Sequence, residues 1–232
     1  AYNVEYMDRI FHNGRISEQM AGKAAAIAAS IARIDADIVG LVEATDKVHR
    51  HQLFLEETVL AHAGYRIAKS EINRGKQDLV LYYRKPFEVV SIDADSEAYD
   101  PWIEDIDEDG IKEYCEFERK PLEVVFGIEG TELRFLVILV LTKSKAVFAI
   151  EDFGGYQRLA LANRKRQLAQ VKRLRTRVAE LLRRPDALPL LVMGDLNDEP
   201  GLDFFQRVIG ASSLETLMGS VFEPELILHN VL

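Results

Sequence analysis

The feature that most constrains the fold is a short apolar run that ends abruptly in polar residues. Leu188 to Met193 is apolar, interrupted only by Pro189, and Gly194-Asp195-Leu196-Asn197-Asp198-Glu199-Pro200 follows at once. A short apolar run bounded by turn-forming residues predicts a buried strand. Carboxylates and amides left unpaired at its end would cost about 1–3 kcal/mol each. They either cap the next helix or form a site at a sheet edge, and this motif alone does not separate the two.

Composition excludes several classes of protein. The 232 residues are 48% hydrophobic, enough for one large core or two small ones. Apolar runs such as Phe135–Leu141 are far shorter than the roughly 20 residues of a membrane span, so no stable membrane insertion is expected. The single cysteine, Cys115, excludes a disulfide framework and a cysteine-based zinc site. The net charge of −9 argues against a broad duplex-binding surface, but not against a nuclease with a local basic patch or a small phosphorylated substrate. The cellular compartment and the oligomeric state stay open.

Hydrophobic periodicity predicts alternating strands and helices. Strands are expected at residues 1–5, 37–42, 65–68, 78–84, 87–92, 122–128 and 133–141, with the last two forming an antiparallel hairpin. Helices are expected at residues 17–34, with Ser17 as cap and Ile34 on the apolar face, and at 47–62, 158–184 and 201–209.

Two charged segments have an ordinary interpretation as solvated surface. The basic face of the 158–184 helix suits a phosphate backbone, but a solvated face is favoured. The acidic segment 93–118 is also expected to be solvated. Its portion Asp107–Gly110 resembles a calcium loop only loosely, because the oxygen-ligand spacing and the closing Glu of that motif are missing.

Polar groups lie at the ends of three of the predicted strands. They are Asn3-Val4-Glu5, then Glu43, then Asp195-Leu196-Asn197-Asp198. If these strands share one sheet and present their carboxyl ends to a single edge, the groups converge. Converging carboxylates repel one another unless a pKa rises or a divalent metal binds. An all-oxygen ligand set suits Mg²⁺ or Mn²⁺, and the matching chemistry is metal-assisted phosphoester hydrolysis.

These motifs, in this order, resemble the endonuclease/exonuclease/phosphatase superfamily. The matching segments are Tyr2–Glu5, Asp37–Glu43, Gly194–Pro200 and, more weakly, Leu141–Lys145. Each segment is weak evidence alone, whereas the ordered set across nearly the whole chain is more specific. The resemblance implies a single α+β domain over residues 1–232. Its fold would be a four-layer α/β/β/α sandwich, with two mainly antiparallel sheets packed face to face.

The resemblance also implies roles at the metal and the attacking water. Glu43 would be the principal ligand of Mg²⁺ or Mn²⁺, and Glu5 would support the metal directly or through water. Asp195 would position or deprotonate the attacking water. Asn3 would orient a ligand or the phosphate.

Further roles concern the substrate. Asn197 would bind a phosphate oxygen, and Lys143 and Ser144 would lie near the substrate. Asp198 is better explained as a turn or cap residue than as a direct participant.

Two departures from the family pattern bear on catalysis. Leu141 stands where the family usually has His, and losing a general acid or base there would cost about 10²–10⁴-fold in rate. The closing Ser-Asp-His pattern is also missing before Leu232, and His229 has no preceding Asp to replace it. We therefore expect a domain that lacks its C-terminal strands.

Two functions follow from these patterns. The first is a divalent-metal-dependent hydrolase of phosphoesters, a nuclease or phosphatase/phosphodiesterase. Its substrate would be nucleic acid, a phosphorylated small molecule or a lipid head group. The alternative is a catalytically degenerate relative that binds a phosphorylated ligand or a protein partner. The intact Glu43, Asp195 and Asn197 favour the enzyme, while Leu141 and the missing terminal His favour the alternative.

Overall fold

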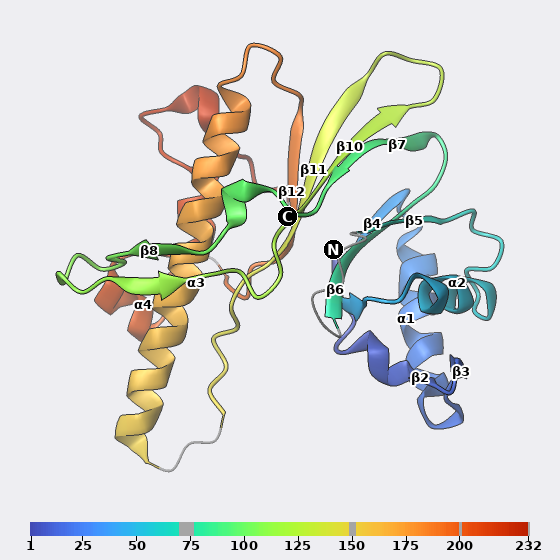
Figure 1. Cartoon of the computed structure of the whole chain (residues 1–232), viewed down its shortest axis with the longest axis horizontal. Coiled ribbons are helices and arrows are strands. Elements are labelled where there is room, and N and C mark those ends of the chain that lie inside the picture. The colour runs from blue at the N-terminus through green and yellow to red at the C-terminus, as the bar shows by residue number, and fades with distance from the viewer. Residues whose placement is uncertain (70–76, 149–151, 200, 232) are drawn as a thin grey trace. The chain divides into compact units, whose positions relative to one another are not determined.

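The computed structural model describes residues 1–69, 77–148, 152–199 and 201–231 (Figure 1). The chain divides into two compact units, each assembled from segments that are separate in the sequence. The first unit contains residues 1–95, 121–140 and 189–195, and the second contains residues 96–120, 141–188 and 196–232.

The first unit holds a mixed four-stranded sheet among its described residues. In sheet order its strands are β1 (Tyr2–Asn3), β4 (Ile38–Thr45), β6 (Gln77–Tyr83) and β5 (Arg66–Lys69). β1 is parallel to β4, whereas β6 is antiparallel to both β4 and β5. Helices α1 (Ala21–Ile34) and α2 (Val48–Glu56) lie beside this sheet (Figure 1). Ala24, Ile27 and Ile31 repeat at helical spacing, so one face of α1 enters the core with Leu41 and Tyr82 of the sheet.

The first unit also contains most of a second four-stranded sheet. Its order is β12 (Leu190–Asp195), β11 (Arg134–Leu141), β10 (Leu122–Ile128) and β7 (Phe87–Asp93). β10 and β11 form the predicted antiparallel hairpin, and β7 is antiparallel to β10.

The two sheets pack face to face, as predicted. A Cβ added to Gly40 of β4 would lie 2.7 Å from Cδ1 of Leu139 and 3.1 Å from Cε of Met193. The rings of Tyr83 and Phe126 also meet, with centroids 5.5 Å apart. Because Gly40 has no side chain, β4 can approach Leu139 of β11 and Met193 of β12 closely. This α+β arrangement is consistent with an α/β/β/α sandwich.

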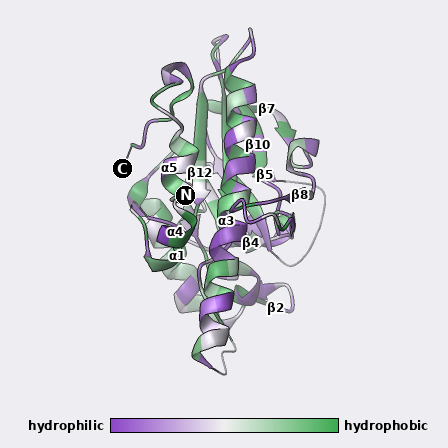
Figure 2. Ribbon diagram, turned by 90° about the vertical axis from the view of Figure 1, so that its left-hand side faces the viewer, coloured by the Kyte–Doolittle hydropathy of each residue, from purple (hydrophilic) through white to green (hydrophobic). Residues whose placement is uncertain are grey.

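The second unit is built on α3 (Phe153–Leu182), which carries polar and apolar residues in turn around its axis (Figure 2). Buried Leu168, Val171, Leu174 and Val178 form its apolar stripe. α4 (Phe204–Ile209) and α5 (Ser213–Met218) pack against α3, and β8 (Trp102–Glu104) pairs with β9 (Glu113–Cys115) as a hairpin.

Short elements make up the rest of the described structure. They are the hairpin β2 (Phe11–His12) and β3 (Arg15–Ile16) and the 3₁₀ turns Met7–Ile10, Glu18–Met20, Glu97–Tyr99 and Pro224–Leu226. No helix in the described ranges is both long and apolar enough to cross a membrane.

Several local predictions were wrong at their boundaries. β12 is not fully buried, because it is the edge strand of its described sheet and Leu191 is 42% exposed. α2 ends at Glu56, and α3 begins at Phe153 because the side chain of Asp152 caps it, accepting a bond from the Gly155 amide at 2.6 Å.

The first helix and the C-terminal region also differ from expectation. The Ser17 side chain makes no capping hydrogen bond, and Ile34 is 66% exposed at the end of α1. α5 was not predicted, although Ser212 caps it by accepting a bond from the Glu215 amide. These differences arise at helix ends, where single polar contacts outweigh the hydrophobic period.

Candidate active site

The sequence predicted Glu43 at the end of its strand, but Glu43 lies at a bulge within β4. Pairing with β6 places Leu41 opposite Val80 and Ala44 opposite Asp78, so β4 contains one extra residue. Glu43 has φ +56°, a backbone region that costs a non-glycine residue about 1–3 kcal/mol. Its neighbours are buried and Glu43 is half-buried. The bulge therefore takes this carboxylate out of the regular alternation of the strand.

Asn3 joins two of the predicted carboxylates. Its Nδ2 donates to Oε1 of Glu43 at 3.2 Å and to Oδ2 of Asp195 at 3.1 Å. Its Oδ1 accepts from the backbone N–H of Glu5 at 2.9 Å, which fixes the amide so that the nitrogen faces the carboxylates. The predicted convergence of these three residues is confirmed. The predicted single sheet edge is wrong, because Asn3 and Glu43 belong to the first sheet and Asp195 to the second.

Gln77 is a site residue that the sequence argument missed. Its Nε2 donates to Oε2 of Glu43 at 3.2 Å, so each oxygen of that carboxylate has an amide donor. The predicted site residues lie at the carboxyl ends of strands, whereas Gln77 is the first residue of β6. Because β6 is antiparallel to β4, its amino end lies beside the carboxyl end of β4.

The Glu43–Asn3–Asp195 group has a donor set that fits a hard divalent cation. Each carboxylate oxygen has two lone pairs, and the hydrogen bonds from Asn3 leave others available. Two half-buried carboxylates near one amide repel each other when both are ionised, which favours a cation between them. All-oxygen ligands suit Mg²⁺ or Mn²⁺.

The Glu5 side chain makes no hydrogen bond to this group among the bonds described, although its backbone N–H bonds Asn3. Its carboxylate is 81% exposed and lies 3.7 Å from Nζ of Lys23. Lys23 also donates to the carbonyl oxygen of Glu5 at 2.7 Å. The role of Glu5 as a metal ligand stays a prediction.

The predicted substrate residues belong to the second unit, where each has a protein partner. Asn197 has φ +50° and donates from Nδ2 to the carbonyl oxygen of Thr142 at 2.9 Å. Lys143 donates to Oε1 of Glu118 at 2.9 Å, and this bond lowers the pKa of the Glu118 carboxyl. Oγ of Ser144 accepts from the Ala146 amide at 3.2 Å.

Gln167 of α3 organises these loops and was also missed. Its side chain is buried, and Nε2 lies 3.1, 3.0 and 2.8 Å from the carbonyl oxygens of Lys143, Leu196 and Asn197. It therefore ties the segment after β11 to the segment after β12. The sequence signal for Gln167 was a polar residue directly before Leu168 of the apolar stripe.

Asp198 has the structural role that the sequence favoured. Its side chain is fully buried and accepts from Nζ of Lys145 at 2.5 Å, from Nε2 of Gln206 at 3.0 Å and from the Ser213 amide at 2.8 Å. Burial raises the pKa of this carboxyl, but the bonds from Lys145, Gln206 and backbone amides outweigh it and hold the pKa below its usual value.

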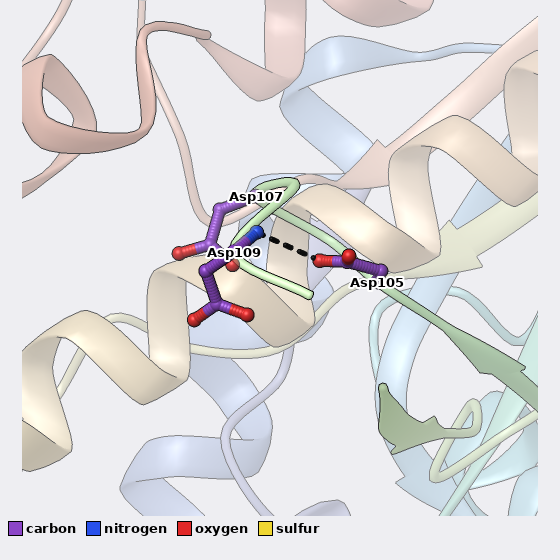
Figure 3. Close-up of side chains that lie close together, drawn as sticks. All are labelled: Asp105, Asp107 and Asp109. Atoms are coloured by element: carbon purple, nitrogen blue, oxygen red, sulfur yellow. Dashed lines mark hydrogen bonds between the residues drawn. The ribbon is translucent and has the colours of Figure 1, made fainter. Parts of the chain in front are cut away.

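The acidic segment is less solvated than predicted, because Lys165 of α3 neutralises it. Figure 3 shows Asp105, Asp107 and Asp109, whose carboxylate oxygens lie within 4.8 Å of one another. Nζ of Lys165 lies 2.7 Å from Oδ2 of Asp107, 3.5 Å from Oδ2 of Asp109 and 3.1 Å from Oε1 of Glu113. Burial lowers the pKa of Lys165, but its bonds to Asp107 and Glu113 raise it overall.

The spacing of these acids is closer to a calcium loop than the sequence argument allowed. Counted from Asp105 instead of Asp107, the three aspartates take the first, third and fifth positions and Glu116 takes the twelfth. Oδ1 of Asp105 accepts from the Asp109 amide at 3.1 Å (dashed in Figure 3). The ammonium group of Lys165 supplies the counter-charge at this loop.

Comparison with known proteins identifies the family. The profile of the Endonuclease/Exonuclease/phosphatase family matches residues 2–220. TDP2 from C. elegans is similar in structure, with a TM-score of 0.51 and 17% identity, over 86% of this chain and 47% of that one. ANGEL2, a 2′,3′-cyclic phosphatase solved with adenosine-2′,3′-vanadate, gives a TM-score of 0.50 and 14% identity over 89% of this chain and 55% of that one.

These structural likenesses are at low identity and show the fold alone. The chain spans about half the length of the two solved structures. No curated protein matches it. Members of the matched family typically depend on a divalent metal. The profile covers nearly the whole sequence, and the chain therefore belongs to the endonuclease/exonuclease/phosphatase family.

Proposed function

We propose that the chain is a phosphoester hydrolase in which Glu43 and Asp195 hold a divalent cation. One observation carries the proposal: the Asn3 amide joins these two carboxylates, which come from different sheets. Packing alone does not require this group, because polar side chains at a sheet-to-sheet contact and a left-handed Glu43 both cost free energy.

The chain's own residues prepare the site. When bound, Mg²⁺ or Mn²⁺ would neutralise phosphate charge and lower the pKa of a bound water. Asn3 and Gln77 fix the Glu43 carboxylate from both sides, so little reorganisation is needed when charge develops. Asp195, held by Asn3, would orient the attacking water and accept its proton. The roles of Glu5, Asn197, Lys143 and Ser144 rest on the family resemblance alone.

The rival function is a degenerate relative that binds a phosphorylated ligand or a protein partner without turnover. Leu141 in place of the family's His supports it. The ion pair between Lys143 and Glu118 also supports it, because the ammonium group of Lys143 was expected to face the substrate.

Metal binding and turnover separate the two functions. We expect the chain to bind Mn²⁺ by calorimetry, and to hydrolyse bis-p-nitrophenyl phosphate with Mg²⁺ or Mn²⁺. Glu43→Gln and Asp195→Asn should abolish both, whereas Asp186→Asn, which removes an exposed carboxylate outside the group, should change neither. Binding without turnover would support the degenerate relative. Mn²⁺ binding that is unaffected by Glu43→Gln and Asp195→Asn would refute the site itself.

A further inference from the structure

Four aromatic rings contact one another in series in the second unit, at the start of α3 and of α4. Phe153 stacks on Tyr156 with ring centroids 6.3 Å apart, Tyr156 meets Phe205 at 5.9 Å, and Phe205 meets Phe204 at 5.2 Å. We call these four residues the aromatic platform. Its two outer rings are exposed to solvent: Phe153 is 73% exposed and Phe204 is 69% exposed.

Polar contacts hold the platform at Phe205 and at the start of α4. Arg164 places its guanidinium 4.9 Å from the centre of the Phe205 ring and pairs with Asp203 at 2.9 Å. Asp203 in turn caps α4 by accepting a bond from the Gln206 amide at 2.8 Å. Exposed aromatic rings that are grouped together are typical of a binding site, whereas isolated exposed rings are common and need no explanation.

Two exposed arginines lie beside the platform. Arg207 follows Phe204 by one helical turn, and Arg158 reaches the first turn of α3, where a Cβ added to Gly154 would lie 3.7 Å from its Nη1. Both are exposed, and neither forms an ion pair with a carboxylate in the described ranges. Arg164, by contrast, is paired with Asp203.

We propose that the aromatic platform, with Arg158 and Arg207, binds single-stranded nucleic acid. Bases would stack on Phe153 and Phe204, and the two guanidinium groups would contact phosphates. Stacking on exposed rings and contacts from neighbouring cations are the two components of sequence-tolerant single-strand binding. An anionic membrane fits less well, because such surfaces are recognised by clusters of 4–8 basic residues. This surface binds without the hydrolytic site, so the inference goes beyond the proposed function.

Binding is tested with a fluorescein-labelled eight-residue oligothymidylate, by anisotropy in EDTA so that metal-dependent hydrolysis plays no part. Phe204→Ala should weaken binding about 5- to 150-fold, the loss expected for one stacked base. Arg207→Gln should weaken binding and reduce the slope of log affinity against log salt by about 0.7, because one phosphate contact is lost. Phe222→Ala, at a ring 91% exposed outside the platform, and Arg184→Gln should change neither quantity.

Three outcomes would overturn the inference. The first is wild-type affinity weaker than about 10⁻⁴ M, the weak limit of non-specific nucleic-acid binding. The second is an equal loss in the Phe222→Ala or Arg184→Gln controls. The third is binding of phosphatidylcholine/phosphatidylserine vesicles that Phe204→Ala abolishes while oligonucleotide affinity stays unchanged, which would assign the surface to a membrane. The assay contains no free divalent metal, so these results can be interpreted even if the chain does not hydrolyse phosphoesters.

Discussion

Gly194, which precedes Asp195 in β12, is the position where one added methyl group should be most damaging. Its φ is +149°, and a Cβ there would lie 1.9 Å from the carbonyl oxygen of Val140 in β11. Contacts of Cβ below 3.0 Å essentially never occur, and the atoms met here are backbone atoms that cannot rotate away. Gly194→Ala must therefore push β12 and β11 apart by more than 1 Å, taking Asp195 with the strand.

The expected loss of stability has two parts. The unfavourable backbone conformation contributes about 1–2 kcal/mol, and the forced displacement of packed backbone contributes about 1–3 kcal/mol. The sum, about 2–5 kcal/mol, is a large share of the 5–15 kcal/mol by which a domain is typically stable. For a chain of this size it corresponds to a fall in melting temperature of about 4–20 °C.

Thermal unfolding followed by circular dichroism measures this loss, with Gly64→Ala as the matched control. Gly64 also has positive φ, +73°, but nothing lies within 4 Å of an added Cβ, so it tests the backbone term alone. Equal melting temperatures for the two variants would refute the close backbone contact. A second consequence should accompany the loss: Gly194→Ala should weaken Mn²⁺ binding, and Gly64→Ala should not.

Three further substitutions test separate contacts. Asp198→Asn should lower the free energy of unfolding in urea by about 1–3 kcal/mol, because Lys145 loses its buried partner and, among the described residues, keeps only Asp203, 3.4 Å away. The pKa of Asp198 is lower in the folded chain than in the unfolded chain. Its stabilisation is therefore complete above the unfolded pKa and is lost as pH falls through the folded pKa. The stability of the Asp198→Asn variant should depend less on pH over that range. Lys165→Met should make the β8–β9 hairpin more susceptible to proteolysis, and added salt should reverse part of the effect by screening the acids. Gln77→Met should weaken Mn²⁺ binding about 10–100-fold in calorimetry, and unchanged affinity would show that Gln77 does not position Glu43.

Features set by neighbouring residues were predictable from the sequence. The apolar face of α1 repeats within a few residues, and the β10–β11 hairpin is formed by adjacent segments. The convergence of Asn3, Glu43 and Asp195 also followed from the sequence, because ordered polar motifs after apolar runs identify them.

Features set by distant pairing were not predictable in this way. Val42-Glu43-Ala44 has the pattern of an ordinary strand, and only pairing with β6 produces the bulge at Glu43. The place of Asp195 depends on which sheet β12 joins, and a single strand does not specify its neighbours. Gln77 was missed because antiparallel pairing brings the beginning of one strand to the end of another.

The bond from Asn3 to Asp195 crosses from one sheet to the other, which has a thermodynamic consequence. A cation held by Glu43 and Asp195 would act as a removable cross-link between the two layers, present only in the folded chain. By mass action, a cation at 100 times its dissociation constant would stabilise the folded state by about 2.7 kcal/mol. The resistance of the two sheets to separation would then vary with the concentration of free metal, so a chelator would weaken the core of the first unit without touching any of its apolar side chains.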